Sequence, residues 1–132
     1  MPRDGKCFIW SLAAATTGTC RVQALNEIVK CMAMAVEWCP AQTGITPLQT
    51  RYLCDQHRCH WGYLVNNTLK IYSDRLHSTV LVLRLSPRGN HVDLYRRRGG
   101  PCCLHRIVDM QGYGIVVECI IPAPTGTFVD LT

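Results

Sequence analysis

The sequence predicts one α+β domain in which helices precede a mostly antiparallel sheet. The chain has 132 residues, which suits a single hydrophobic core, so we expect residues 1–132 to form one domain. Apolar residues recur at helical spacing in the first half, whereas the second half contains β-branched segments separated by turns. No internal repeat is present, and helices followed by strands favour α+β over alternating βαβ units.

Three helices are expected before the sheet. The first runs from Cys7 to about Ala15 and ends near Gly18, and Thr19 can cap the second. The second helix carries apolar residues at three- and four-residue steps, which places them on one face: Val22, Leu25, Val29, Met32 and Val36. The segment "TPLQTRYLC", residues 46–54, begins the third helix with a capping-box pattern and a proline at the first helical position.

Four strands are expected after the sequence period changes from helical to extended. These segments are rich in β-branched and aromatic residues: "TLKIY" (68–72), "TVLVLRL" (79–85), "HVDLY" (91–95) and "YGIVVECII" (113–121). The link "SPRGN" between the second and third strands has the length, the proline and the glycine of a hairpin loop. We therefore expect these two strands to pair antiparallel.

The composition predicts a soluble protein that has no membrane segment. No apolar run approaches the roughly 18 to 20 residues of a membrane helix, and no secretion signal opens the chain. Nine cysteines are an odd number, and without a secretion signal we expect reduced thiols. The formal charge is +5, but its one dense basic run, residues 96–98, is small, so nucleic acid is not an expected partner.

Cys7 is a candidate nucleophile because it stands at the predicted start of the first helix. The unpaired N–H groups of a helix N-terminus carry partial positive charge, which stabilises a thiolate, and Lys6 adds positive charge nearby. Gly5 allows a substrate to approach the backbone closely, and the N–H of Cys7 can serve as an oxyanion donor. The alternative is a small buried core cysteine, which is the commoner situation for this residue type.

A candidate base and its orienting group lie in "GNHVDLY". His91 starts a predicted strand, and Asp93 points to the same side because side chains alternate along a strand. If this strand end meets the start of the first helix, Cys7, His91 and Asp93 form the nucleophile, base and orienter of thiol acyl-transfer chemistry. The alternative is a histidine bonded to a loop and a solvated carboxylate.

These motifs resemble a known protease family. "DGKCFIWSL" resembles the motif that opens the first helix of ovarian tumour (OTU) cysteine proteases, and "GNHVDLY" resembles their terminal strand. Trp61, the following "NNTLKIYS" and the strand pair ending at His91 are similar to the stretch between those motifs, so the resemblance covers residues 4–95. It implies a compact papain-like deubiquitinase fold, with Cys7 as nucleophile, His91 as base and Asp93 as third member.

The same resemblance implies an oxyanion loop at residues 4–6: Asp4, Gly5 and Lys6. The compact chain is more similar to the virus-encoded members of positive-strand RNA viruses, of the tymovirus, arterivirus and benyvirus type. Those enzymes cut the viral polyprotein and often remove ubiquitin, so the expected partners are ubiquitin or a related modifier and a viral polyprotein. The expected location is the host cytoplasm, as part of a viral replication polyprotein or released from it.

Ubiquitin ends in Gly-Gly, so a cleft too narrow for side chains would select it. The candidates for the cleft walls are aromatic and polar residues near the motifs: Trp10, Trp61, Asn90 and Tyr95. Core packing is the alternative for the aromatic residues, since large aromatic rings dominate protein cores.

Catalysis by these residues requires no cofactor, but two segments suggest a structural zinc ion. "CDQHRCHW" and "CCLH" concentrate residues that bind zinc: Cys54, His57, Cys59, His60, Cys102, Cys103 and His105. They match no complete zinc-finger pattern, and buried thiols with exposed loop histidines explain the same residues. A second functional hypothesis follows, in which the chain is a non-catalytic Cys/His-rich zinc-binding interaction module with a basic, RNA-contacting surface.

Overall fold

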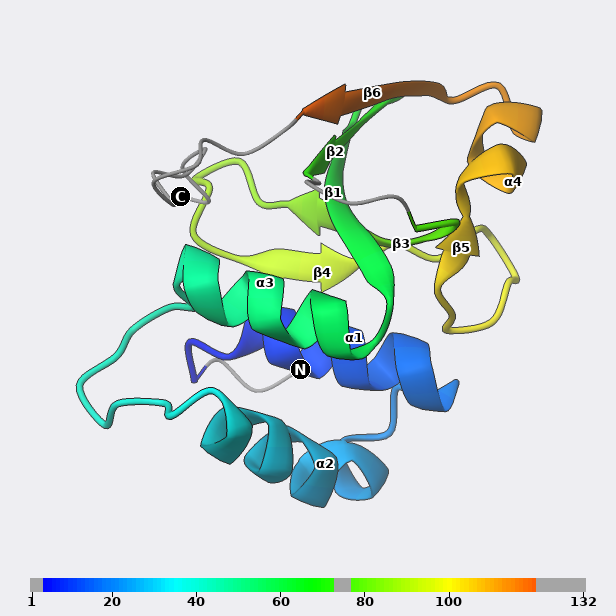
Figure 1. The fold of residues 1–132 in the computed structure, drawn as a ribbon. Helices are drawn as coiled ribbons and strands as arrows, with labels where there is room; N and C mark the ends of the chain where they lie inside the picture. Colours follow the sequence, from blue (N-terminus) through cyan, green and yellow to red (C-terminus); the bar gives the residue numbers. More distant parts are fainter. Residues whose placement is uncertain (1–3, 73–76, 121–132) are drawn as a thin grey trace.

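The computed structural model describes residues 4–72 and 77–120, which form a mixed β-sheet with helices on both faces (Figure 1). Three helices come first along the chain: α1 (Cys7–Thr17), α2 (Val22–Ala35) and α3 (Pro47–Gln56). The strands and one further helix follow: β1 (Cys59–Val65), β2 (Thr68–Tyr72), β3 (Thr79–Leu85), β4 (Val92–Leu94), β5 (His105–Arg106), α4 (Ile107–Gly112) and β6 (Val116–Ile120). The predicted α+β class is confirmed.

The sheet has the strand order β4-β3-β1-β2-β6, and β5 also pairs with β3. The pairs β1–β2, β3–β4 and β3–β5 are antiparallel, as expected for the hairpin between β3 and β4. The pairs β1–β3 and β2–β6 are parallel. The sheet is therefore mixed, with antiparallel pairs in a narrow majority.

Three elements, β1, β5 and α4, were not predicted from the sequence. β1 lies in the middle of the sheet, but its sequence "CHWGYLV" combines cysteine, histidine and glycine, which give a weak strand signal. Its residues become a strand because β2 and β3 pair with it on both sides. The last predicted strand is present as β6, and Ile121 at its predicted end lies outside the described residues.

Helix α1 is the centre of the larger core layer. Its residues from Phe8 to Ala15 are all buried, since α2 packs on one side of the helix and the sheet strands β3 and β4 on the other (Figure 1). The helix ends at Gly18, whose φ of 79° is left-handed, as glycine permits. Within the described residues, no helix has both the length and the apolar character needed to cross a membrane.

The caps of α2 and α3 differ from each other. Thr19 does not cap α2 directly, because the N-cap is Arg21 and the Thr19 hydroxyl accepts from the Arg21 N–H at 3.2 Å. In α3 the predicted capping box is present, with Thr46 as N-cap and Gln49 as its partner. The side chains of Thr46 and Gln49 therefore accept hydrogen bonds from backbone N–H groups at the N-terminus of α3.

Strand β3 separates two apolar layers, which explains its nearly continuous hydrophobic sequence. Leu81 and Leu83 belong to the layer that contains α1, whereas Val80 and Val82 belong to the layer that contains α4. Alternation of side chains buries β3 on both faces, as expected for a strand covered on both sides of a sheet.

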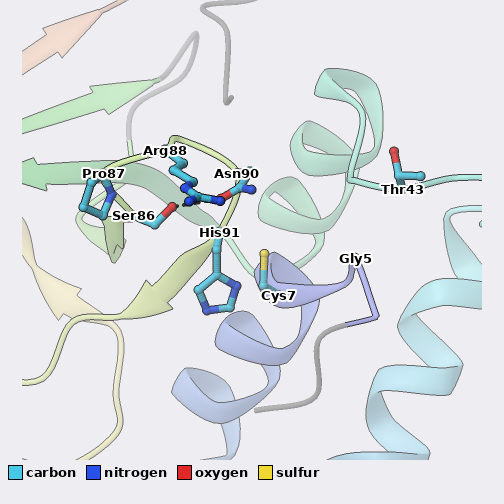
Figure 2. Close-up of a pocket in the computed structure, with 8 residues that line it drawn as sticks. All are labelled: Gly5, Cys7, Thr43, Ser86, Pro87, Arg88, Asn90 and His91. Atoms are coloured by element: carbon cyan, nitrogen blue, oxygen red, sulfur yellow. Dashed lines mark hydrogen bonds between the residues drawn. The ribbon is translucent and has the colours of Figure 1, made fainter.

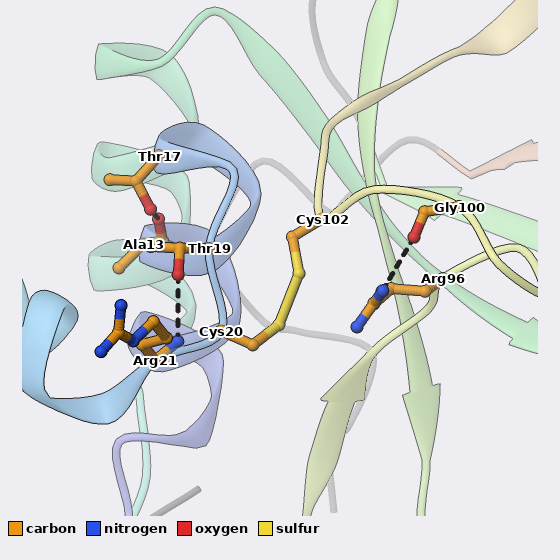
Figure 3. The surroundings of a disulfide bond; sticks show 8 residues. All are labelled: Ala13, Thr17, Thr19, Cys20, Arg21, Arg96, Gly100 and Cys102. Atoms are coloured by element: carbon orange, nitrogen blue, oxygen red, sulfur yellow. Dashed lines mark hydrogen bonds between the residues drawn. A yellow bond between two sulfur atoms is a disulfide. The ribbon is translucent and has the colours of Figure 1, made fainter.

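One pair of cysteines is oxidised, which corrects the expectation of reduced thiols. Cys20, between α1 and α2, forms a disulfide with Cys102, between β4 and β5 (Figure 3). Their Cα atoms lie 6.8 Å apart, and 82 positions separate them in sequence. The other cysteines are free: Cys7, Cys31, Cys39, Cys54, Cys59, Cys103 and Cys119. The sequence could not identify this pair, because its partners meet only in the tertiary structure.

Candidate active site

Cys7 is the first residue of α1, as predicted, and its side chain is half-buried. The N-cap residue is Lys6, and no side chain accepts a hydrogen bond from the first turn of α1. At the start of helix α3, by contrast, the side chains of the capping box accept hydrogen bonds from backbone N–H groups. The N–H groups at the start of α1 are therefore available to an anion, either a Cys7 thiolate or an oxyanion beside it.

The loop before Cys7 is held in a fixed shape by Asp4. One carboxylate oxygen of Asp4 accepts from the Lys6 N–H at 3.0 Å, and the other accepts from the Trp10 indole N–H at 3.3 Å. Gly5 has a φ of 80°, and a Cβ atom added there would lie 2.5 Å from the carbonyl oxygen of Thr43. Only glycine therefore fits this close approach between the loop and the chain that precedes α3.

His91 immediately precedes β4, and Asp93 lies within it. The His91 Nε2 atom lies 3.0 Å from Oδ1 of Asp93, so the predicted contact between these side chains is present. The His91 carbonyl accepts from the Ser86 N–H at 2.8 Å, which closes the hairpin between β3 and β4. Asp93 is 65% exposed and His91 is 30% exposed, so the imidazole is the more enclosed partner.

Packing of α1 against β4 brings Cys7 and His91 together. Figure 2 shows the two side chains next to each other, Cys7 on the first turn of α1 and His91 at the entry to β4. Two adjoining pockets of about 540 and 390 Å³ contain both residues, and they also share Gly5, Thr43 and Asn90. The first includes Ser86, Pro87 and Arg88, and the second includes Phe8, Gly44, Ile45, Tyr63, Gly89 and Val92.

Of the residues expected to form the cleft walls, Asn90 lies at the pockets, whereas the three aromatic residues lie elsewhere. Trp10 is 3% exposed and its indole bonds to Asp4. Trp61 is 4% exposed and stacks on Tyr72 with ring centroids 4.4 Å apart. Tyr95 packs against the layer that contains α4. These rings therefore line neither pocket, since Trp10 and Trp61 are buried in the core and Tyr95 is partly buried.

Lys6 does not line the pockets that contain Cys7. Its ammonium nitrogen lies 3.9 Å from Oδ2 of Asp4 and 5.4 Å from the ring centroid of Trp38. The charge of Lys6 is thus paired with Asp4 rather than directed at the sulfur. The Asp4 carboxylate offsets the positive charge of Lys6, whereas the N–H groups at the start of α1 carry partial positive charge next to Cys7.

The first cluster of predicted zinc ligands separates into different environments. Cys54, near the end of α3, and Cys59, at the start of β1, are buried with their thiols in contact. Burial raises the pKa of Cys54, and the contact with Cys59 raises it further. His57 caps α3, while His60 Nε2 accepts from the His77 N–H at 2.9 Å.

The second cluster is not brought to the first. Cys102 forms the disulfide, Cys103 is half-buried in the same loop, and the His105 ring packs against Tyr95 with centroids 5.6 Å apart. Over residues 4–72 and 77–120, no three histidine, cysteine, aspartate or glutamate side chains form a group that could hold a metal ion. The two predicted clusters therefore do not combine into one zinc site within that part of the chain.

Several residues at the pockets were missed from the sequence. Thr43 lies between α2 and α3, where the sequence carries no motif, and Arg88 lies within the quoted hairpin link. Tyr63 lies on β1, the strand that was not predicted. Recognition of β1 would have placed Tyr63 on the same face as Trp61, two residues earlier.

Comparison of the chain with protein-family models, with curated proteins and with solved structures finds no match. Any function assigned to these pockets therefore depends on their geometry and on the sequence motifs that line them.

Proposed function

We propose that the chain is a cysteine protease of the OTU type that cleaves after Gly-Gly. One observation carries this proposal: Cys7 and His91, far apart in sequence, line the same pockets, and Asp93 bonds to the imidazole. The motifs "DGKCFIWSL" and "GNHVDLY", which resemble those of the family, supply these same three residues. A thiol, a base and an orienting carboxylate are the groups that acyl transfer by cysteine requires.

The proposed reaction begins when His91 removes the thiol proton of Cys7. Because Asp93 holds Nε2, Nδ1 is the ring nitrogen left to accept the thiol proton, and the carboxylate fixes the orientation of the ring. The thiolate attacks the carbonyl carbon, and the N–H groups at the start of α1 stabilise the tetrahedral oxyanion. His91 then protonates the leaving amine, and water hydrolyses the thioester with His91 as base.

The proposed substrates are ubiquitin conjugates, conjugates of a related modifier, or a viral polyprotein. Small residues at the pockets support a cleft for Gly-Gly: Gly5, Thr43, Gly44 and Gly89. The close approach of Gly5 to Thr43 holds the loop before Cys7 against the chain that precedes α3. The proposed location is the host cytoplasm, within a viral replication polyprotein or after release from it.

A ubiquitin probe with an electrophilic C-terminus tests the proposal. We expect the probe to label the wild-type protein and the Cys39→Ala variant, because Cys39 is an exposed thiol away from the pockets. The Cys7→Ala variant should not be labelled, and His91→Ala should be labelled at least about 100-fold more slowly. A folded wild-type protein that the probe does not label would refute the deubiquitinase activity.

A peptide substrate separates ubiquitin recognition from polyprotein cleavage. We expect cleavage after Gly-Gly in a short peptide that lacks the folded part of ubiquitin, and loss of cleavage in Cys7→Ala. Cleavage of the peptide without probe labelling would restrict the function to polyprotein processing. Absence of both reactions in folded protein would reject the protease assignment.

A further inference from the structure

The two pockets that share Cys7 and His91 differ in their other lining residues. The smaller pocket, about 390 Å³, is lined mainly by glycine and by apolar or aromatic side chains: Phe8, Gly44, Ile45, Tyr63, Gly89 and Val92. The larger pocket, about 540 Å³, is lined instead by the turn between β3 and β4: Ser86, Pro87 and Arg88. A substrate whose scissile bond lies at Cys7 and His91 therefore enters two different environments on the two sides of that bond.

The turn that carries Arg88 is held in a defined shape by hydrogen bonds. The Ser86 N–H donates to the His91 carbonyl at 2.8 Å, and the Gly89 N–H donates to the Ser86 carbonyl at 2.8 Å. The Ser86 hydroxyl donates to Oδ1 of Asn90 at 3.2 Å, which orients the side-chain amide of Asn90. These bonds fix the turn, so Arg88 forms part of the pocket wall on the side of His91 (Figure 2).

Arg88 brings positive charge to the larger pocket, and the described residues that line this pocket include no carboxylate. In the part of the chain that the structure describes, no ion pair or hydrogen bond engages its guanidinium group. The nearby acids have other partners, since Asp4 accepts from two N–H groups near the start of α1 and Asp93 bonds to His91. A guanidinium group is permanently charged, and its forked donors match the two oxygens of a carboxylate. The larger pocket therefore suits an acidic group.

From this arrangement, and on the basis of the proposed function, we infer that Arg88 is a specificity-determining residue that binds an acidic side chain directly after the Gly-Gly bond. The smaller pocket suits the two glycines, because glycine and apolar residues form its walls. The larger pocket then receives the leaving side of the substrate, where an aspartate or glutamate side chain meets Arg88. A lysine side chain in an isopeptide bond carries no carboxylate at this position. The preferred substrate is therefore a linear peptide bond, as in a polyprotein.

Peptides that differ in one group test this inference. Glutamate and glutamine after Gly-Gly have nearly the same shape, so the ratio of the two kcat/KM values reports recognition of the carboxylate. We expect the wild-type protein to prefer the glutamate peptide about five- to tenfold, a moderate preference because Arg88 is exposed and water screens its charge. In Arg88→Gln the ratio should fall to about one. Arg88→Glu should prefer a peptide with lysine at this position over the glutamate peptide.

Arg98→Gln is the matched control, because Arg98 is also exposed but lines neither pocket. This variant loses the same charge as Arg88→Gln, and its preference for the glutamate peptide should equal that of the wild-type protein. If Arg88 only stabilised the turn, Arg88→Gln would lower kcat/KM equally for both peptides and leave their ratio unchanged. That result, or a wild-type ratio near one, would overturn the inference.

A binding measurement separates failure of this inference from failure of the proposed function. Cys7→Ala cannot form a thioester, so fluorescence anisotropy of labelled peptides gives the Kd of each peptide without turnover. Tighter binding of the glutamate peptide that is lost when Arg88→Gln is added would support the carboxylate site. If the wild-type protein cleaves neither peptide, this result rejects the protease assignment alone. Cleavage of both peptides at equal rates, with equal Kd values, would overturn the inference and leave the protease assignment intact.

Discussion

The imidazole of His91 and the carboxylate of Asp93 lie on the same side of the chain at the entry to β4, with Nε2 3.0 Å from Oδ1. Residues two positions apart in extended chain share a face, so this contact follows from local structure. The pairing fixes which nitrogen of His91 is directed toward Asp93. The other ring nitrogen, Nδ1, is then left to accept the proton of Cys7 in the proposed reaction.

The first prediction concerns Asp93. We expect Asp93→Ala to lower kcat/KM about tenfold, since the imidazole loses the group that orients it. Asp93→Asn should retain most of the activity, because an amide oxygen can still accept from Nε2–H. Both variants should melt near the wild-type temperature, as Asp93 is 65% exposed. Equal loss of activity in the two variants would show that the charge matters rather than orientation.

The second prediction concerns the loop before Cys7. Gly5→Ala should lower the free energy of unfolding by about 1 to 3 kcal/mol, because its φ of 80° is unfavourable for alanine and its Cβ would meet Thr43. It should also reduce the rate of Cys7 labelling. Gly44→Ala is the matched control, since no atom lies within 4 Å of its added Cβ. Urea denaturation measures the free energy of unfolding of the two variants. Equal stability of Gly5→Ala and Gly44→Ala would contradict the close approach of Gly5 to Thr43.

The third prediction concerns the disulfide. Cys20→Ala should lower the free energy of unfolding by about 2 to 4 kcal/mol, because Cys20 and Cys102 close a long loop. Cys39→Ala should change stability little, since Cys39 is exposed and free. Thiol titration of the wild-type protein in denaturant without reductant should find seven free cysteines. A titration of nine thiols would show that the pair is reduced.

The fourth prediction concerns stability in acid. Burial lowers the pKa of His105 and of His60 from the ordinary 6.5, and in His60 the neighbouring His77 adds to the effect. The unfolded state therefore binds protons first as the pH falls. The stability that these neutral rings contribute is complete above about pH 6.5 and is lost as the pH falls through their folded-state pKa values.

We therefore expect the melting temperature to decrease between pH 7 and pH 5, and to decrease less in His105→Asn. Asparagine is a polar side chain that can still donate a hydrogen bond, but it does not titrate. Thermal denaturation between pH 7 and pH 5 measures how steeply the melting temperature changes with pH. Equal slopes in the wild type and the variant would exclude His105 as a source of the acid sensitivity.

Local patterns determined much of this protein. The apolar period of α2, the capping box of α3 and the hairpin between β3 and β4 depend on neighbouring residues, and all three are visible in the sequence. The positions of Cys7 at a helix start and of His91 beside Asp93 have the same local origin. Such features need no knowledge of what packs against them.

Tertiary structure alone decided the rest. The weak sequence of β1 becomes a central strand because β2 and β3 pair with it, and this pairing buries Trp61 and brings Tyr63 to the pocket of Cys7. The partnership of Cys20 with Cys102 likewise depends on loops that are distant in sequence. Periodicity specifies which face of an element is apolar, but the element that covers this face is chosen by packing across the whole chain.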